Sequence, residues 1–145
     1  YHLQPNQMDI EVTESVMMKN IEHNGSDEDA NGLSLLQSKG VEISIDDFGT
    51  GYSSLSYIKH LNVDRIKIDK SFIDDIELNP EARSIVLAII KMGHSLGIKV
   101  LAEGIETPNQ LNILKSLECD EGQGYLFSKP LDAAQFEQKC LQTKG

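Results

Sequence analysis

Two adjacent carboxylates, Asp46 and Asp47, follow the apolar run 41–45. Along a regular strand they would point to opposite faces, but a bend at the end of the strand lets both point to one place. Two negative charges that close need a shared proton or a divalent cation, and hard cations such as Mg²⁺ prefer oxygen ligands. Gly49 and Gly51 then allow a tight loop beside a ligand. The pair therefore indicates a cation site, although an ordinary turn between a strand and a helix accounts for the same residues.

Each predicted strand of the chain has a polar residue at or near its end. The full set is Glu11, Asp46, Lys67, Glu103 and Gln123. Their spacing averages about 28 residues, close to the roughly 31 residues per unit of an eight-unit βα barrel. In that fold the catalytic groups stand at the carboxyl ends of the strands, so these residues are candidates for one common site.

Strands and helices alternate along the chain. Apolar and alternating patterns predict strands at 8–13, 41–45, 64–69 and 98–102, with a compact last strand or turn at 122–125. Helical patterns begin near Leu33 and at Ser54, Asn79, Thr107 and Asp132. The polar stretch 19–32 is predicted to be a surface loop.

The helix that begins at Asn79 is predicted to be the longest. Asn79 is a favourable N-cap residue, Pro80 suits the first turn and Gly97 ends the helix. Its buried face is predicted to carry Ile85, Ile89, Met92 and Leu96.

This alternation predicts an α/β fold in which outer helices cover a parallel sheet. A doubly wound open sheet has the same local pattern, but it gathers its ligand groups at one crevice. Polar residues on every successive strand favour a partial TIM-type (β/α) barrel of about five βα units.

Composition limits the function classes. The 145 residues suit one domain, and 39% hydrophobic residues indicate a folded core. The net charge of −10 opposes non-specific binding to DNA or RNA, which needs clustered basic residues. An anionic substrate stays possible, because bound metal ions reverse the local charge.

The sequence also gives an expectation for the cellular location of the protein. It has no apolar run of about 18 residues and no signal-peptide pattern, so we expect a cytoplasmic protein, with the question of an upstream membrane anchor left open. Cys119 and Cys140 lack metal-ligand spacing and are expected to be reduced thiols rather than a disulfide.

Five ordered blocks of the chain resemble the EAL family of cyclic di-GMP phosphodiesterases. They are IEVTES (10–15), DDFGTGYSS (46–54), IKIDKSF (66–72), AEGIE (102–106) and QGYLFSKP (123–130). They occur in family order and near family spacing over almost the whole chain. One Asp-Asp-Phe-Gly match would be weak support, whereas five blocks in order are specific.

The resemblance implies a barrel whose active site holds two Mg²⁺ or Mn²⁺ ions and hydrolyses cyclic di-GMP to the linear dinucleotide pGpG. It implies that the metal ligands are Glu11, Asp46, Asp47 and Glu103, with Asp46 bridging. Two such ions about 3.5–4 Å apart would clamp the attacking and leaving oxygens of the phosphodiester. Lys67 is implied to orient or activate the attacking water, and among several acids it keeps its proton. Glu103 is the better proton acceptor.

Three further residues have roles that the resemblance implies. Gln123 holds the water or the substrate, Glu106 is a lesser site residue, and Glu14 anchors the loop 48–54, which couples dimerisation to the metal site in this family. Plainer explanations stay open for several site residues. They are a solvated edge charge for Glu11, an ion-pair partner for Lys67, a turn residue for Gln123 and a charge at a helix start for Glu106.

One departure from the family pattern matters. The Glu-Ala-Leu signature that names the family is absent, as is the metal-binding Asn expected before Glu11. We therefore expect residues 1–145 to be the C-terminal portion of one EAL domain, without the first strands of the barrel. Because strand edges would then be open, we expect the fragment alone to be inactive and to associate through these edges or as a homodimer. An upstream GGDEF (diguanylate cyclase) or sensor domain is common in such proteins and stays an open question.

Two other functions stay open. A non-hydrolysing cyclic di-GMP receptor would share the site, although the replacements at Asp47, Lys67 or Glu103 that would favour it are not present. The third hypothesis is an interaction module with no activity of its own.

Overall fold

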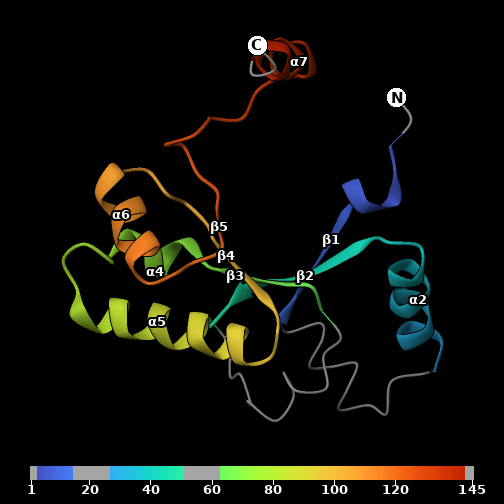
Figure 1. The fold of residues 1–145 in the computed structure, drawn as a ribbon, viewed down its shortest axis with the longest axis horizontal. Coiled ribbons are helices and arrows are strands. Elements are labelled where there is room, and N and C mark those ends of the chain that lie inside the picture. Colours follow the sequence, from blue (N-terminus) through green and yellow to red (C-terminus); the bar gives the residue numbers. More distant parts are fainter. Residues whose placement is uncertain (1–2, 15–26, 51–62, 143–145) are drawn as a thin grey trace.

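The computed structural model describes residues 3–14, 27–50 and 63–142 of the chain. Within these residues, five parallel strands form one sheet, in the order in which they occur along the chain (Figure 1). They are β1 (Asp9–Thr13), β2 (Glu42–Phe48), β3 (Arg65–Ile68), β4 (Lys99–Ala102) and β5 (Glu121–Gly122). A doubly wound sheet reverses its strand order at a switch point, whereas a barrel keeps it. The predicted partial TIM-type barrel is therefore confirmed, and the open-sheet alternative is wrong.

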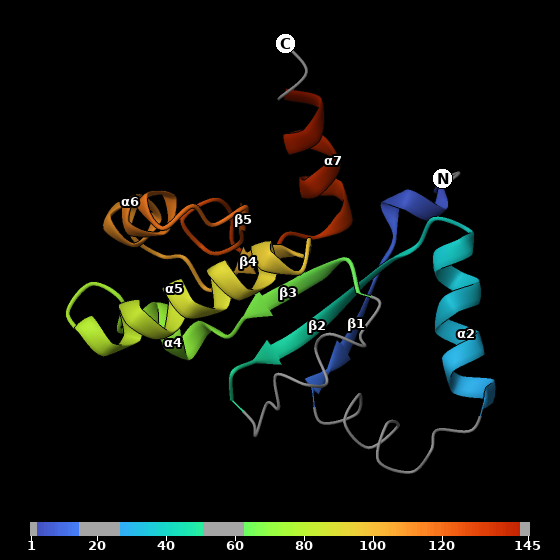
Figure 2. The same cartoon turned by 60° about the horizontal axis from the view of Figure 1, so that its bottom comes forward.

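All but the last of the described helices lie over one face of this sheet. In the described part of the chain the helices are α2 (Asp27–Ser38), α4 (Lys70–Asp74), α5 (Pro80–Ser95), α6 (Pro108–Ser116) and α7 (Ala133–Gln142), with a 3-10 turn η1 (Pro5–Gln7) before β1. Helix α5 packs on β3, β4 and α4, and α2 packs on β2. Figure 2 shows α7 standing up from the sheet, away from the layer formed by α4, α5 and α6. None of these helices is both long enough and apolar enough to cross a membrane.

The core between the sheet and the helices consists mainly of isoleucine and valine. From β3, Ile66 and Ile68 are fully buried in it. The residues that meet the strands from the helices are Ile73 in α4, Val86, Ile89 and Ile90 in α5, and Leu114 in α6. Because side chains alternate along a strand, Arg65 and Lys67 point to the opposite face of β3.

The ends of α5 are as predicted, but part of its buried face is not. The side-chain oxygen of Asn79 accepts hydrogen bonds from the backbone N–H groups of Glu81 and Ala82, and Pro80 occupies the first turn. The buried residues are Ala82, Val86, Ile89, Ile90 and Gly93, whereas Ile85 and Leu96 are 38% and 39% exposed. A Cβ at Gly93 would lie 2.5 Å from Val100 Cγ2, so the helix approaches β4 through its glycine. The face of α5 that meets β4 therefore includes Gly93, while Ile85 and Leu96 lie at its margin.

Two predicted boundaries are also wrong. The polar stretch predicted as a loop over 19–32 is helical from Asp27, because acidic residues in a first turn interact favourably with the helix dipole. Strand β2 continues through Asp46 and Asp47 to Phe48, instead of ending at Ile45. The short helix α4 has no counterpart among the predicted elements, and the helix predicted at 54–60 lies outside the described residues.

The face of the sheet opposite the helices carries a largely buried arginine at the amino ends of the strands. Arg65, whose side chain is 11% exposed, forms ion pairs with Asp9 on β1, Glu42 on β2 and Glu121 on β5 at 2.9, 2.7 and 2.7 Å. Burial alone would lower the pKa of Arg65, but its hydrogen bonds to Glu121 and Glu42 outweigh that effect and raise it. One guanidinium therefore links carboxylates from three other strands.

We predict that Arg65→Met lowers the free energy of unfolding by about 3–5 kcal/mol, because three carboxylates lose their shared cation. Urea unfolding followed by circular dichroism measures the loss. The matched control is Lys99→Met, since Lys99 is 59% exposed and lies 3.6 Å from Glu121. That substitution is expected to change the free energy of unfolding by less than about 1 kcal/mol. Equal effects of the two substitutions would contradict the proposed contribution of Arg65 to the free energy of unfolding.

Cys119 is a free thiol held between β4 and β5. Its Sγ donates to the carbonyl oxygens of Val100 and Glu121, each at 3.4 Å. Burial raises the pKa of the Cys119 thiol to about 11. Because the thiolate is the nucleophile, this mostly protonated thiol reacts slowly at neutral pH.

We predict that Cys119 reacts about 100-fold more slowly with iodoacetamide at pH 7.5 in the folded protein than in urea, since its pKa is raised by about two units. A Cys140→Ser background leaves Cys119 as the one thiol, and mass spectrometry follows its alkylation. Equal rates in the folded and unfolded protein would show that the thiol is accessible and not held as described.

Candidate active site

A second buried cation lies on the same strand and the same face as Arg65, at the carboxyl ends of the strands. Lys67 Nζ lies 2.5 Å from Glu11 Oε1, 2.8 Å from Glu103 Oε1 and 3.2 Å from Asp46 Oδ1. The structure thus brings together four of the residues that the strand ends predict.

Parallel pairing explains this convergence. Thr13 on β1 is the partner of Asp46 on β2, so Glu11 lies two residues before that level. On the other side, Lys67 pairs with Leu101, and Glu103 follows two residues later on the same face of β4. The backbone N–H of Glu103 also donates to Ile68 O at 3.2 Å, which extends the β3–β4 pairing past the end of the strand. Glu11, Asp46 and Glu103 therefore approach Lys67 from three different strands.

Lys67 is held in its protonated form. Its side chain is 5% exposed, and burial alone would lower its pKa. Hydrogen bonds to Glu103 and Glu11 and the nearby charge of Asp46 act in the opposite direction and raise the pKa overall. The ammonium can therefore donate hydrogen bonds and offset negative charge, but it cannot accept a proton near neutral pH.

The cluster has more negative than positive charge. Three carboxylates face one ammonium, which leaves an excess of two formal negative charges. In addition, the buried oxygen Asp46 Oδ1 has no hydrogen-bond partner among the described residues, since its 3.2 Å approach to Lys67 lacks hydrogen-bond geometry. Carboxylate oxygens with excess charge suit a hard divalent cation. The residues present therefore fit a metal ion, although within the described ranges no three potential ligands are already arranged around one cation position.

Asp47 differs from its neighbour in the described structure. It has φ of 55°, in the left-handed region, where the register of β2 against β3 is irregular. Its carbonyl oxygen accepts hydrogen bonds from Thr50 N and Thr50 Oγ1 at 3.3 and 2.8 Å. Asp47 is exposed, and of the two adjacent carboxylates Lys67 contacts Asp46. The bend predicted at this strand end is present, but it does not bring Asp47 to the ammonium.

Glu14 contacts the start of the loop that it is predicted to anchor. Gly49 N donates to Glu14 Oε2 at 3.4 Å, which joins the end of β1 to the segment after β2. Gly49 has φ of 95°, and a Cβ there would lie 3.1 Å from Phe72 Cε2. Residues 51–54 of the predicted loop lie outside the described part of the chain.

Glu106 and Gln123 lie apart from the ion pairs of Lys67. Glu106 Oε1 pairs with Lys70 Nζ at 2.6 Å, on the exposed side of the strand ends. Gln123 is exposed, but its backbone is fixed, because its N–H donates to Ala102 O and its carbonyl oxygen accepts from Ile105 N. A Cβ at Gly124 would lie 2.1 Å from Ile105 O, so the two segments touch through their backbones.

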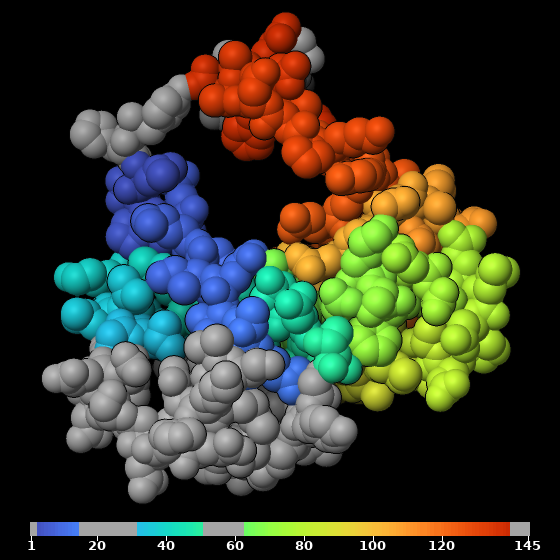
Figure 3. Space-filling model, turned by 180° about the vertical axis from the view of Figure 1, so that it is seen from behind, coloured from blue at the N-terminus to red at the C-terminus, as the bar shows by residue number. Residues whose placement is uncertain are grey.

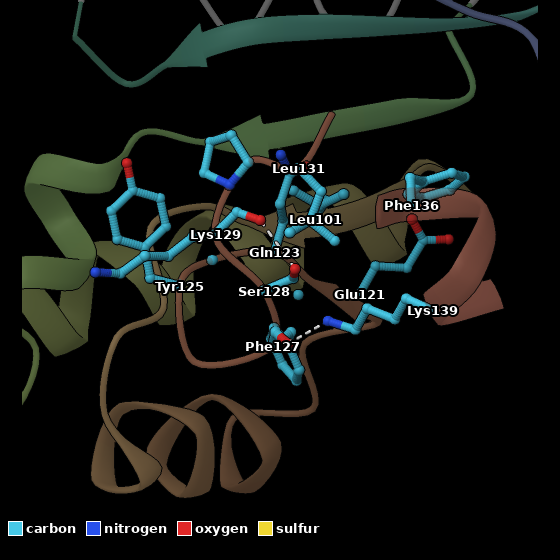
Figure 4. Close-up of a pocket in the computed structure, with 13 residues that line it drawn as sticks. Leu101, Glu121, Gln123, Tyr125, Phe127, Ser128, Lys129, Leu131, Phe136 and Lys139 are labelled. Carbon is cyan, nitrogen blue, oxygen red and sulfur yellow. Dashed lines mark hydrogen bonds between the residues drawn. The ribbon is translucent and has the colours of Figure 1, made fainter. Parts of the chain in front are cut away.

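A groove of about 690 Å³ runs along the face of the sheet that carries Gln123. Figure 4 shows Leu101 and Gln123 near the centre of the view, with Glu121 to their right together with Phe136 and Lys139 of α7. Figure 3 shows that the molecule is hollowed between η1 and the C-terminal segment that leads to α7. The groove is therefore open and lined by both apolar and charged side chains.

The charged layer around Arg65 is not among the predicted site residues. Its signal in the sequence is the pair Asp9 and Glu11, two residues apart on one strand, with Arg65 and Lys67 at the same spacing on another. Because side chains alternate along a strand, the two residues of each pair lie on the same face of the sheet. Two basic residues on one strand therefore indicate two levels at which acidic residues of the other strands can pair with them.

Comparison with known proteins identifies relatives over nearly the whole chain. The family model described as EAL domain matches residues 1–130. "Signaling protein YkoW" of Bacillus subtilis is 49% identical over 142 residues, which is 98% of this chain and 17% of that protein. "Cyclic di-GMP phosphodiesterase NbdA" of Pseudomonas aeruginosa is 47% identical over 131 residues, which is 90% of this chain and 16% of that protein. The chain thus spans about a sixth of the length of these relatives.

Solved structures have the same architecture. "PaMucR Phosphodiesterase, c-di-GMP complex" matches 92% of this chain and 52% of that one, with a TM-score of 0.82 and 42% identity. The Klebsiella pneumoniae BlrP1 manganese/cy-diGMP complex matches 88% of this chain and 31% of that one, with a TM-score of 0.77 and 37% identity. With the family match over residues 1–130, these similarities show that the chain belongs to the EAL domain family.

Proposed function

We propose that this chain belongs to a metal-dependent phosphodiesterase that hydrolyses cyclic di-GMP to pGpG in the cytoplasm, as part of bacterial second-messenger signalling. The observation that carries the proposal is the convergence of Glu11, Asp46 and Glu103 on Lys67. Relatives named as cyclic di-GMP phosphodiesterases support it, including one that is 47% identical. The activity is assigned to the intact domain.

The residues that would hold two Mg²⁺ or Mn²⁺ ions are Glu11, Asp46, Asp47 and Glu103. The excess negative charge supports this assignment, as does Asp46 Oδ1, which has an ion pair with Lys67 but no hydrogen bond among the described residues. When bound, such ions activate water and neutralise charge on the phosphodiester. EAL structures described as manganese/cy-diGMP and calcium/cy-diGMP complexes support a divalent cation.

The side chains of the cluster have distinct roles in the proposed reaction. Lys67 keeps its proton, so its ammonium donates hydrogen bonds to the attacking water and offsets the charge that develops on the phosphate. Glu103, 2.8 Å from that ammonium, is the carboxylate that takes a proton from the water. Gln123 holds substrate or water from the groove, and Glu106 has a lesser part in the same site.

The proposal also covers assembly. Residues 1–145 are assigned to the C-terminal portion of one EAL domain, which agrees with the 52% coverage of the PaMucR chain. Glu14 is assigned as the anchor of the loop 48–54 and links a homodimer interface to the metal site, with its contact to Gly49 N as support. Association through open strand edges is the other mode considered for this chain.

A non-hydrolysing cyclic di-GMP receptor is the competing proposal. One observation favours it: in the described part of the chain the carboxylates contact an ammonium, and no ready metal site is present. A receptor needs the groove and the charged side chains around Lys67, but it does not need a metal ion.

We predict that the full-length protein converts cyclic di-GMP to pGpG in the presence of Mn²⁺ or Mg²⁺. Addition of EDTA is expected to stop product formation, and excess Mn²⁺ is expected to restore it. Separation of the nucleotides by chromatography measures both results. Binding of cyclic di-GMP without any pGpG would reject the phosphodiesterase and support the receptor.

We predict that Lys67→Met lowers kcat by about 10²–10³-fold, because the reaction loses a fixed positive charge. Binding of cyclic di-GMP in Ca²⁺ is expected to change far less. Lys99→Met is the control, since this exposed lysine lies at the amino end of the neighbouring strand and is expected to keep full activity. A Lys67→Met variant with normal kcat would remove Lys67 from the proposed mechanism.

A further inference from the structure

The loop 103–107 joins β4 to α6 and begins with Glu103. Hydrogen bonds hold most of its backbone N–H groups. Glu103 N donates to Ile68 O at 3.2 Å, and Ile105 N donates to Gln123 O at 3.0 Å. The next two, Glu106 N and Thr107 N, donate to one side-chain oxygen, Gln110 Oε1, at 2.8 and 3.0 Å. A single side chain therefore holds the second half of the loop.

Gln110 also contacts the element that follows Lys67. It is 5% exposed, and its Nε2 donates to Ile73 O in α4 at 3.1 Å. Helix α4 begins at Lys70, directly after β3. The Gln110 amide thus links the segment after Glu103 to the segment after Lys67.

There is little spare room between these two segments. A Cβ at Gly104 would lie 2.3 Å from Lys70 Cγ, so the Lys70 side chain lies directly on the loop. The Lys70–Glu106 ion pair also joins them, but both side chains are nearly half exposed, and exposed pairs contribute little. The buried amide is therefore the stronger polar link.

We propose that Gln110 is a positioning residue for the phosphodiesterase reaction proposed above: its amide fixes the loop 103–107 against α4 and so holds the Glu103 carboxylate beside Lys67. Gln110 acts through the loop, and its recorded contacts are with Glu106, Thr107 and Ile73. The effect of Gln110 on the reaction rests on the proposed function. Its effect on the position of the loop rests on its hydrogen bonds and its burial.

Gln110→Met tests the proposal, because methionine has a similar shape but can neither accept from the two N–H groups nor donate to Ile73 O. Mn²⁺ affinity of the full-length protein, measured by electron paramagnetic resonance, is expected to fall about 10–100-fold, as for other groups that orient metal ligands. Hydrogen exchange of the segment 103–107 is expected to become faster, and kcat at limiting Mn²⁺ is expected to fall with the affinity.

Asn109→Met is the matched control. Asn109 is the neighbouring residue of the same helix turn, is exposed, and donates to Glu77 Oε2 at 3.3 Å rather than to the loop. This variant is expected to stay within twofold of wild type in Mn²⁺ affinity and kcat. A general weakening of the start of α6 would affect both variants equally and would overturn the proposal.

Gln110→Glu separates positioning from a purely structural role. At neutral pH its carboxylate accepts from Glu106 N and Thr107 N but has no hydrogen to donate to Ile73 O. After protonation it can do both, and burial raises the pKa of a carboxyl group. The Mn²⁺ affinity of Gln110→Glu relative to wild type is therefore expected to rise as pH falls from 8 to 5.5. The same ratio for Gln110→Met is expected to stay constant.

The outcomes distinguish this inference from the proposed function. If wild type makes no pGpG, the proposed function fails, while Mn²⁺ affinity and hydrogen exchange still decide the part of Gln110. If Gln110→Met has wild-type Mn²⁺ affinity and exchange, the inference fails whatever the activity. Should Gln110→Met fold poorly, the pH dependence within Gln110→Glu decides, and a ratio that does not change with pH rejects the inference.

Discussion

The ammonium of Lys67 among three carboxylates is the interaction on which the rest of the site depends. Glu11, Asp46 and Glu103 come from three strands and would repel one another at close range without a cation between them. The parallel register brings them within reach, and the raised pKa of Lys67 keeps the positive charge in place. The ammonium leaves part of the negative charge unbalanced and one oxygen of Asp46 without a hydrogen bond. The same arrangement therefore stabilises the strand ends and keeps them receptive to a cation.

Two cations divide the inner face of the sheet into two layers. Arg65 holds Asp9, Glu42 and Glu121 at the amino ends, where its planar, permanently charged fork suits several fixed partners. Lys67 stands two residues later and presents a compact charge on a flexible stem to its three carboxylates. The opposite face of the sheet carries isoleucine and valine against the helices. The charged residues and the apolar core thus lie on opposite faces of the same five strands.

Most of the strand order and the strand ends could be predicted from the sequence, because alternation and capping are local. The caps Asn79 and Asp132 and the polar residues Glu11, Lys67 and Glu103 belong to this group. The full buried face of α5 could not be predicted, since it includes the contact between Gly93 and Val100, which are not neighbours in the chain. Helix α4 is too short to show a periodic pattern. The left-handed backbone of Asp47 and the partners of Arg65 likewise arise only when strands meet.

The backbone of Asp47 has a further consequence. A residue with a side chain and φ of 55° is less stable than glycine would be at that position, by about 1 kcal/mol or more. Substitution by glycine would relieve this local strain and remove the carboxylate at the same step. Variants selected for thermal stability alone would therefore drift away from aspartate at this position, whereas the proposed metal-ligand role predicts that variants selected for turnover retain it. Competition between these two selections would reveal whether the position serves folding or chemistry.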